Sequence, residues 1–233
     1  MNDIVTTEIS SLPSLLGASL GDTGKEFAEI AIDSVLNDGV LKDIPIVGAI
    51  AGFCKFGISI REKNLLKQTL EFINAFNSGT ISPERLTKYK NEIETNPKKA
   101  EKELGRCLII LNSTIERVHS RLLGRLYNSY VKGAISWDKF VELSDASQRL
   151  FVEDIRHLKE IDRRREAHVD VDDVNAYKYF RLQSIGLLSS ATGAFKTENK
   201  DVRVINLSSN FFTVSQFGVT FIQNSGLRDL EII

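Results

Sequence analysis

The stretch LGRCLIILNSTIERVHSRLLGRL, residues Leu104–Leu126, decides the fold class of this chain. Its apolar residues recur at intervals of three and four, which places their side chains on one face of an α-helix. The residues of this seam are Leu104, Leu108, Leu111, Ile115, Val118, Leu122 and Leu126. The spacing predicts a single helix of about six turns, with its apolar face covered by other helices.

A second long helix is expected after a turn at Gly133. Ser136 is a favourable N-cap, and the apolar residues that follow it have helical spacing. These residues are Trp137, Phe140, Val141, Phe151, Ile155 and Leu158. Two helices of about 30 residues joined by a short turn predict a long antiparallel αα-hairpin.

Earlier helices are expected to cover this hairpin. One is expected to end near Asn77–Gly79, and the next to begin with Ser82 as N-cap and Pro83 at the first helical position. Residues 22–167 are therefore interpreted as an α-helical bundle. Residues 1–21, rich in Ser and Gly, are interpreted as a flexible N-terminal arm.

The tail, residues 168–233, changes in character. Its expected elements are a helix over Asp170–Leu188, strands over Val202–Leu207 and Phe211–Val214, and a short helix over Ser215–Asn224. Tyr177 and Ile185 are expected to face inward. The fold class predicted for the whole chain is mainly α: a helical bundle with a long αα-hairpin, plus a small C-terminal winged-helix-like α+β element.

Two short motifs carry a resemblance. The segment Leu182-x-x-Ile185-Gly186-Leu187-Leu188 and the segment Phe212-x-Val214-Ser215-x-x-Gly218-x-x-Phe221 resemble the end of many prokaryotic winged-helix domains. The whole chain is similar to uncharacterised bacterial proteins that join a helical bundle to such a tail. Some of these proteins are associated with phage defence, and the resemblance implies a role of that kind.

Composition argues against several classes of protein. The 233 residues are 42% hydrophobic with a net charge of −1, which argues against disorder and against a global attraction to nucleic acid. Cys54 and Cys107 form no CxxC pair, and residues 1–24 lack the pattern of a secretory signal. A cytoplasmic location is expected.

The most unusual segment is IPIVGAIAGFCKFGISI, Ile44–Ile60. Gly48 and Gly52 have the spacing that lets two helices approach closely, but the segment is shorter than the roughly 20 apolar residues of a membrane span. A buried central helix is the favoured interpretation, and a helix that enters a membrane only when triggered is the alternative. The candidate residues are Ile44, Val47, Gly48, Gly52, Phe53, Lys55, Phe56 and Gly57.

Two sets of charged residues are candidate binding groups. A face for anions or for a partner comprises Arg106, Arg117, Arg121, Arg125, Arg163, Arg164 and Arg165. Interleaved Glu101, Glu103 and Glu116 favour an ordinary ion-paired, solvated face over binding of phosphate, acidic protein or anionic lipid. Candidate nucleic-acid contacts in the tail are Lys178, Arg181, Gln183, Lys196, Lys200 and Arg203. Neighbouring acids make protein docking the favoured role of the tail over DNA reading.

No pattern of catalytic residues is found. The sequence lacks HExxH and a Walker A motif, and no catalytic, metal-binding or cofactor-binding residue is predicted. We therefore expect a non-enzymatic protein that acts through a protein partner or through homo-oligomers, in phage defence or a related conflict system. A membrane-active effector and a winged-helix DNA-binding regulator are the alternatives. No small-molecule substrate is evident.

Overall fold

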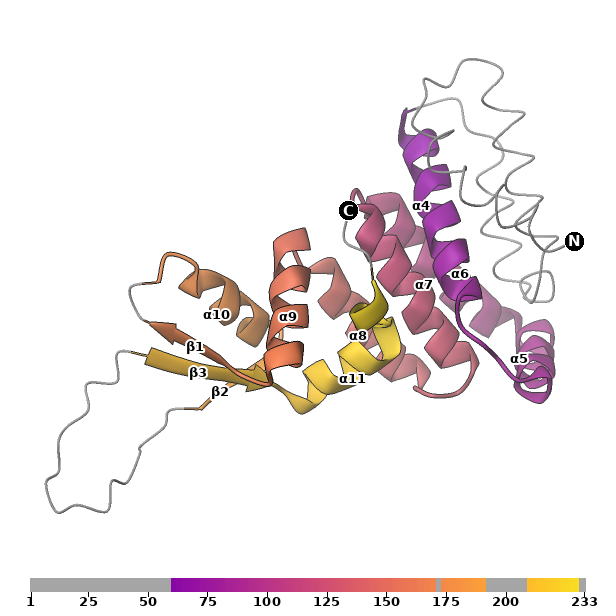
Figure 1. Cartoon of the computed structure of the whole chain (residues 1–233). Helices are drawn as coiled ribbons and strands as arrows, with labels where there is room; N and C mark the ends of the chain where they lie inside the picture. The colour runs from indigo at the N-terminus through magenta and orange to yellow at the C-terminus, as the bar shows by residue number, and fades with distance from the viewer. Residues whose placement is uncertain (1–59, 171–172, 192–208, 231–233) are drawn as a thin grey trace, which may run out of the picture. The chain divides into compact units, whose positions relative to one another are not determined.

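A computed structural model describes residues 60–170, 173–191 and 209–230 of the chain (Figure 1). The chain divides into two compact units, residues 1–134 and residues 135–233. Eight α-helices and a small antiparallel sheet make up most of the described residues, which confirms a mainly helical fold. The predicted arm over residues 1–21 and the predicted strand Val202–Leu207 lie outside the described residues.

The first unit is formed by helices packed on one another. They are α4 (Ile60–Asn77), α5 (Pro83–Thr95), α6 (Pro97–Ser113) and α7 (Arg117–Val131). Helices α4 and α7 lie side by side, and Phe72, Phe76 and Tyr127 are buried where they meet (Figure 1). At Gly124 of α7 an added Cβ would lie 2.3 Å from the Phe72 carbonyl oxygen, so glycine permits this close approach.

Several predicted helix ends are confirmed. The Ser82 hydroxyl accepts a hydrogen bond from the Arg85 backbone N–H, and Pro83 occupies the first turn of α5. Ser136 caps α8 (Trp137–Gln148) in the same way, through the Lys139 N–H. Gly133, with φ of +82°, follows the end of α7.

The predicted single helix over Leu104–Leu126 is wrong. The chain leaves the helical conformation between α6 and α7, where Thr114 is extended and Ile115 is 79% exposed. Asn64 Nδ2 of α4 donates to the Thr114 carbonyl at 2.8 Å, and Gln68 Nε2 donates to the Ile115 carbonyl at 2.7 Å. These tertiary hydrogen bonds replace the intrahelical bonds that a continuous helix would have made.

The second helix of the predicted hairpin is also interrupted. It is divided into α8 and α9 (Val152–Arg164), with Leu150 and Phe151 between them. The Asp154 carboxylate accepts a hydrogen bond from the Phe151 N–H at 3.0 Å and so satisfies the first turn of α9. The four helices α6 to α9 are 12 to 17 residues long, so two helices of about 30 residues are not formed.

The second unit adds a small sheet to α8 and α9. Its further elements are β1 (Ala167–Asp170), α10 (Ala176–Ser184), β2 (Leu188–Ala191), β3 (Ser209–Val214), α11 (Gln216–Ser225) and the 3₁₀ helix η2 (Leu227–Asp229). Strand β3 lies between β1 and β2 and is antiparallel to both (Figure 1). This grouping differs from the domain boundary predicted between residues 167 and 168.

The tail differs from its prediction in one helix and in the strands β1 and β2, which were not expected. The expected helix over Asp170–Leu188 is shorter, because its ends are strand residues of β1 and β2 and Gly186 turns the chain with φ of +87°. Tyr177 is 55% exposed, so its predicted inward orientation is wrong, while Ile185 is half-buried. The strand Phe211–Val214 and the helix that begins after Ser215 are confirmed.

Candidate functional site

The outer face of α10 carries large apolar side chains in contact with solvent. Tyr177 and Phe180, three residues apart, lie along one side of this helix, and Val174 lies in the turn that precedes it. Their exposed fractions are 84%, 55% and 46%, and that of Phe151, at the start of α9, is 62%. We call these four residues the aromatic surface.

Arg181 links two members of the aromatic surface. Its guanidinium carbon lies 4.3 Å from the centre of the Phe151 ring and 5.3 Å from the centre of the Tyr177 ring. Both distances are within the range of cation–π attraction. The arginine therefore joins α10 to the first turn of α9 and limits the motion of the two exposed rings.

Arg181 is also held by the buried carboxylate of Asp154. Arg181 Nε donates to Asp154 Oδ2 at 2.8 Å, and Nη2 donates to Oδ1 at 2.5 Å. The Asp154 side chain is fully buried, and its hydrogen bond raises the pKa of Arg181 above the ordinary value. Within the described part of the chain, Nη1 is not used in this pairing and its two N–H groups remain available.

Rings behind the aromatic surface hold α10 against the sheet. Tyr179 stacks on Phe212 of β3 with ring centres 5.5 Å apart, and His157 of α9 meets Tyr179 edge-on at 5.8 Å. Phe180 also contacts Phe212, in a T-shaped arrangement at 5.4 Å. Packing on Phe212 therefore holds α10 in place, and Phe180 belongs both to this packing and to the aromatic surface.

Such a surface suits recognition of another protein. Exposed aromatic groups that cluster with an arginine are typical of the energetic centre of protein interfaces. Phe151 and Tyr177 are already oriented by Arg181, so little side-chain freedom would be lost on binding. The sequence identified Arg181 as a candidate, but it did not identify Phe151, Val174, Tyr177 or Phe180.

The predicted nucleic-acid residues of α10 are largely engaged within the chain. Arg181 is paired with Asp154, and Gln183 Nε2 donates to Ser190 Oγ at 2.7 Å. Lys178 is half-buried on α10. The other candidates, Lys196, Lys200 and Arg203, lie outside the described residues.

The predicted basic face is divided between the two units. In the first unit, Arg117 and Arg121 both pair with Glu71 of α4, at 3.6 Å and 2.7 Å. Arg106 and Arg125 also make interactions within the chain. The acid that pairs these cations is thus contributed by α4 and was not among the interleaved acids considered from the sequence.

In the second unit, Arg163 and Arg164 both pair with Glu160 one turn earlier on α9, at 2.8 Å and 2.5 Å. Arg165 follows the helix in the left-handed conformation, with φ of +78°. The three arginines therefore do not form one uniform patch, because two share a carboxylate and the third leaves the helix.

A buried polar cluster in the first unit was missed by sequence reasoning. The Glu103 carboxylate, 1% exposed, accepts hydrogen bonds from Tyr89 and Tyr130 at 2.5 Å and from Tyr127 at 3.0 Å. Burial raises the pKa of all three phenols well above the ordinary value of 10.0. These hydrogen bonds link α5, α6 and α7 to one another.

The remaining predictions concern a membrane helix, a metal site and the cysteines. Residues Ile44–Gly57 lie outside the described residues, and no described helix is long and apolar enough to cross a membrane. No group of three or more His, Cys, Asp or Glu side chains suited to a metal ion occurs among the residues that the structure describes. Cys107 is buried, and burial raises the pKa of its thiol.

Comparisons with known proteins give no relative for this chain. No family model, no curated protein and no solved structure matches it significantly.

Proposed function

We propose that this protein is a non-enzymatic interaction protein that binds a protein partner, or a second copy of itself, through the aromatic surface of α10. The observation that carries the proposal is the exposure of Phe151, Val174, Tyr177 and Phe180, between 46% and 84%. Monomeric proteins rarely leave such groups clustered in water unless they form a binding site. The resemblance to bacterial helical-bundle proteins supports a setting in phage defence or a related conflict system.

Charge distribution favours protein over nucleic acid as the partner. A protein surface that binds nucleic acid needs cationic side chains that reach the phosphate groups. On α10, Arg181 is neutralised by Asp154, and its guanidinium lies between rings. An apolar partner surface with a carboxylate near its centre would pack on the rings and accept from Arg181 Nη1.

Site-specific photo-cross-linking in the native host tests the proposal. Phe180 is replaced by p-benzoylphenylalanine, and the matched control carries the same group in place of Gln223, an exposed residue of α11. We expect one discrete adduct from position 180, lost when Tyr177→Ser is added, and none from position 223. An adduct of twice the 26.1 kDa chain mass would identify a second copy as the partner.

A folded Phe180 variant that gives no discrete adduct would refute the proposal, as would identical adducts from both positions. Circular dichroism of each variant establishes that the fold is kept. Mass spectrometry of the adduct then identifies the partner.

A winged-helix DNA-binding function is the second candidate. Two features support it. The strands lie in the spatial order β1–β3–β2, and α10 follows β1 and precedes β2 in the sequence. In such an arrangement the helix before the β2–β3 pair is the one that enters a DNA groove. Salt-dependent binding to duplex DNA that falls in Lys178→Glu would favour this function. Absence of duplex binding at about 50 mM salt would exclude it, because phosphate contacts are strongest at low salt.

A further inference from the structure

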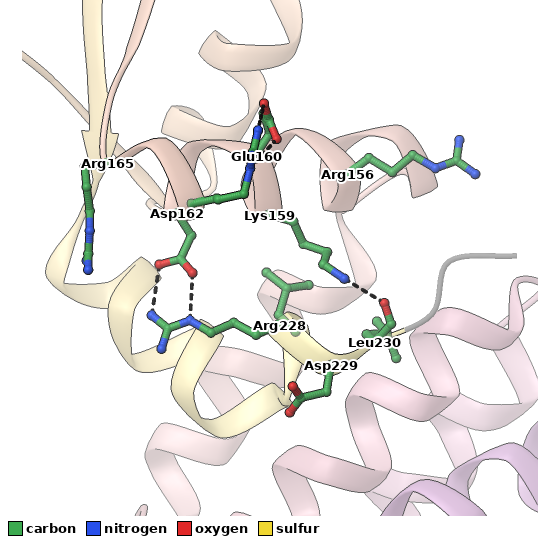
Figure 2. A pocket seen from close by; sticks show the side chains of 10 residues that line it. Arg156, Lys159, Glu160, Asp162, Arg165, Arg228, Asp229 and Leu230 are labelled. Carbon is green, nitrogen blue, oxygen red and sulfur yellow. Dashed lines mark hydrogen bonds and ion pairs between the residues drawn. The ribbon is translucent and has the colours of Figure 1, made fainter.

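A cavity in the second unit lies beside α9, on residues distinct from the aromatic surface. It is a solvent-open cavity of about 940 Å³ between α9, from Arg156 onward, and the segment Leu227–Leu230 (Figure 2). This volume is in the range of sites for small organic ligands, about 300–1,000 Å³. Leu227 and Leu230, which are buried, lie at its base, and the other eight lining residues are all charged.

Cations outnumber acids in this cavity. Five cationic side chains line it, namely Arg156, Lys159, Arg163, Arg165 and Arg228, against the acids Glu160, Asp162 and Asp229. Two of the three acids are engaged. Arg228 is held by Asp162 through two hydrogen bonds of 2.7 Å and 3.0 Å, and Glu160 pairs with Arg163. The lining residues sum to a charge of +2, and the sum is +1 when Glu153, which pairs with Arg156 from outside the lining, is included. The excess is positive in both cases, which favours an anionic ligand.

Two of the cations are fixed in position by the fold. Lys159 Nζ donates to the Leu230 carbonyl at 2.8 Å, and the Asp162 pair fixes the Arg228 guanidinium (Figure 2). A pre-positioned donor loses little conformational freedom when it meets a ligand. Both groups retain N–H donors beyond those that these bonds use.

The backbone conformation of Arg165 is a second observation in favour of a ligand in this cavity. It is the C-cap of α9 and has φ of +78°, a conformation that glycine adopts readily and arginine adopts at a cost. Among the described residues it is the one non-glycine residue with positive φ. Its side chain extends along the cavity at the end opposite to Arg156 (Figure 2). An arginine at a position that favours glycine is accounted for if its side chain binds a ligand.

We infer that this cavity binds a phosphorylated small molecule of nucleotide size, with its phosphates near Arg165 and Arg228. Arginine supplies several N–H donors in one plane, which suits the oxygens of a diphosphate. The negative end of the α9 dipole opposes an anion at this place, and the arginines offset that effect.

The probes are pyrophosphate and ADP, titrated into the full-length protein by calorimetry at constant ionic strength. Arg165→Gly removes the side chain and also relieves the backbone, so the variant should be at least as stable as the wild type. We expect it to bind ADP about tenfold more weakly, the usual loss of one charge-assisted contact. Arg165→Lys should recover part of the affinity.

Arg149→Gly is the matched control. It removes the same charge from an exposed helix C-cap of the same unit, and it should leave ADP binding unchanged. The inference is overturned if the wild type binds neither probe at millimolar concentration, or if Arg165→Gly and the wild type bind equally. Binding to vesicles that contain phosphatidic acid, without binding to either soluble probe, would also overturn it and indicate a membrane surface instead.

Discussion

Single glycine residues set how closely helices approach in the first unit, and Gly124 is the clearest case. A Cβ at Gly124 would lie 2.3 Å from the Phe72 carbonyl oxygen, whereas a Cβ at Gly105 of α6 would meet no atom within 4 Å. We predict that Gly124→Ala destabilises the fold by about 1–3 kcal/mol through overpacking. Gly105→Ala should stabilise it by about 0.5–1 kcal/mol, because alanine favours the helix. Urea unfolding of the two variants measures both effects, and equal midpoints would contradict the α4–α7 packing.

The Arg181–Asp154 pair is a second residue-scale feature, because its carboxylate is fully buried while its guanidinium is partly exposed. Arg181→Met should cost about 3 kcal/mol, since it leaves the Asp154 charge buried without its partner. Asp154→Asn combined with Arg181→Met should cost less than the sum of the two single changes. A double-mutant cycle by urea unfolding gives the coupling free energy, and a value near zero would show that the pair does not stabilise the unit.

At the scale of elements, the sequence predicted where helices begin better than where they break. Ser82, Ser136 and Ser215 are local signals, because each hydroxyl accepts from a backbone N–H three residues later. The break between α6 and α7 depends on side chains about 50 residues away in sequence, Asn64 and Gln68. Apolar periodicity continues through that break, so it gives no sign of it.

The α6–α7 break yields a third prediction. Gln68 is fully buried, donates to the Ile115 carbonyl at 2.7 Å and accepts from Ser120 Oγ at 2.7 Å. Gln68→Leu would remove the hydrogen-bond partner of the Ile115 carbonyl and of the Ser120 hydroxyl. We therefore expect a loss of about 1–3 kcal/mol in the free energy of unfolding. Asn91→Ala, at an exposed position of α5, is the control and should change stability by less than about 0.5 kcal/mol. If the two variants unfold alike, Gln68 does not hold the break.

For the molecule as a whole, the sequence predicted the helical class and, in the tail, the strand Phe211–Val214 and the helix after it, but not β1 or β2. It predicted less of the candidate site. Tyr177 was expected to face inward because residues 170–188 were treated as one helix. The side of that helix expected to be buried was therefore wrong. Phe151 was included in a helical seam, although the chain turns at this residue. Burial of these positions depends on the three-dimensional contacts of α9, α10 and the sheet, which periodicity along one segment does not contain.

The buried tyrosine cluster of the first unit predicts how the molecule responds to alkaline pH. The pKa values of Tyr89, Tyr127 and Tyr130 are raised in the folded state, so these phenols remain protonated there above pH 10. In the unfolded chain they ionise near pH 10, so the unfolded state then binds fewer protons and stability falls as pH rises. For three phenols the expected slope is about 4 kcal/mol per pH unit above pH 10.

Absorbance at 295 nm and far-ultraviolet circular dichroism, followed together from pH 9 to pH 12, measure this response. The tyrosinate signal of Tyr89, Tyr127 and Tyr130 should appear together with the loss of helix, because these phenols cannot ionise while buried beside Glu103. Tyr130→Phe should reduce the slope by about one third, since it removes one of the three titrating groups, although it also removes a hydrogen bond to Glu103. Ionisation of all five tyrosines near pH 10 with the helical signal intact would show that the cluster is open to solvent.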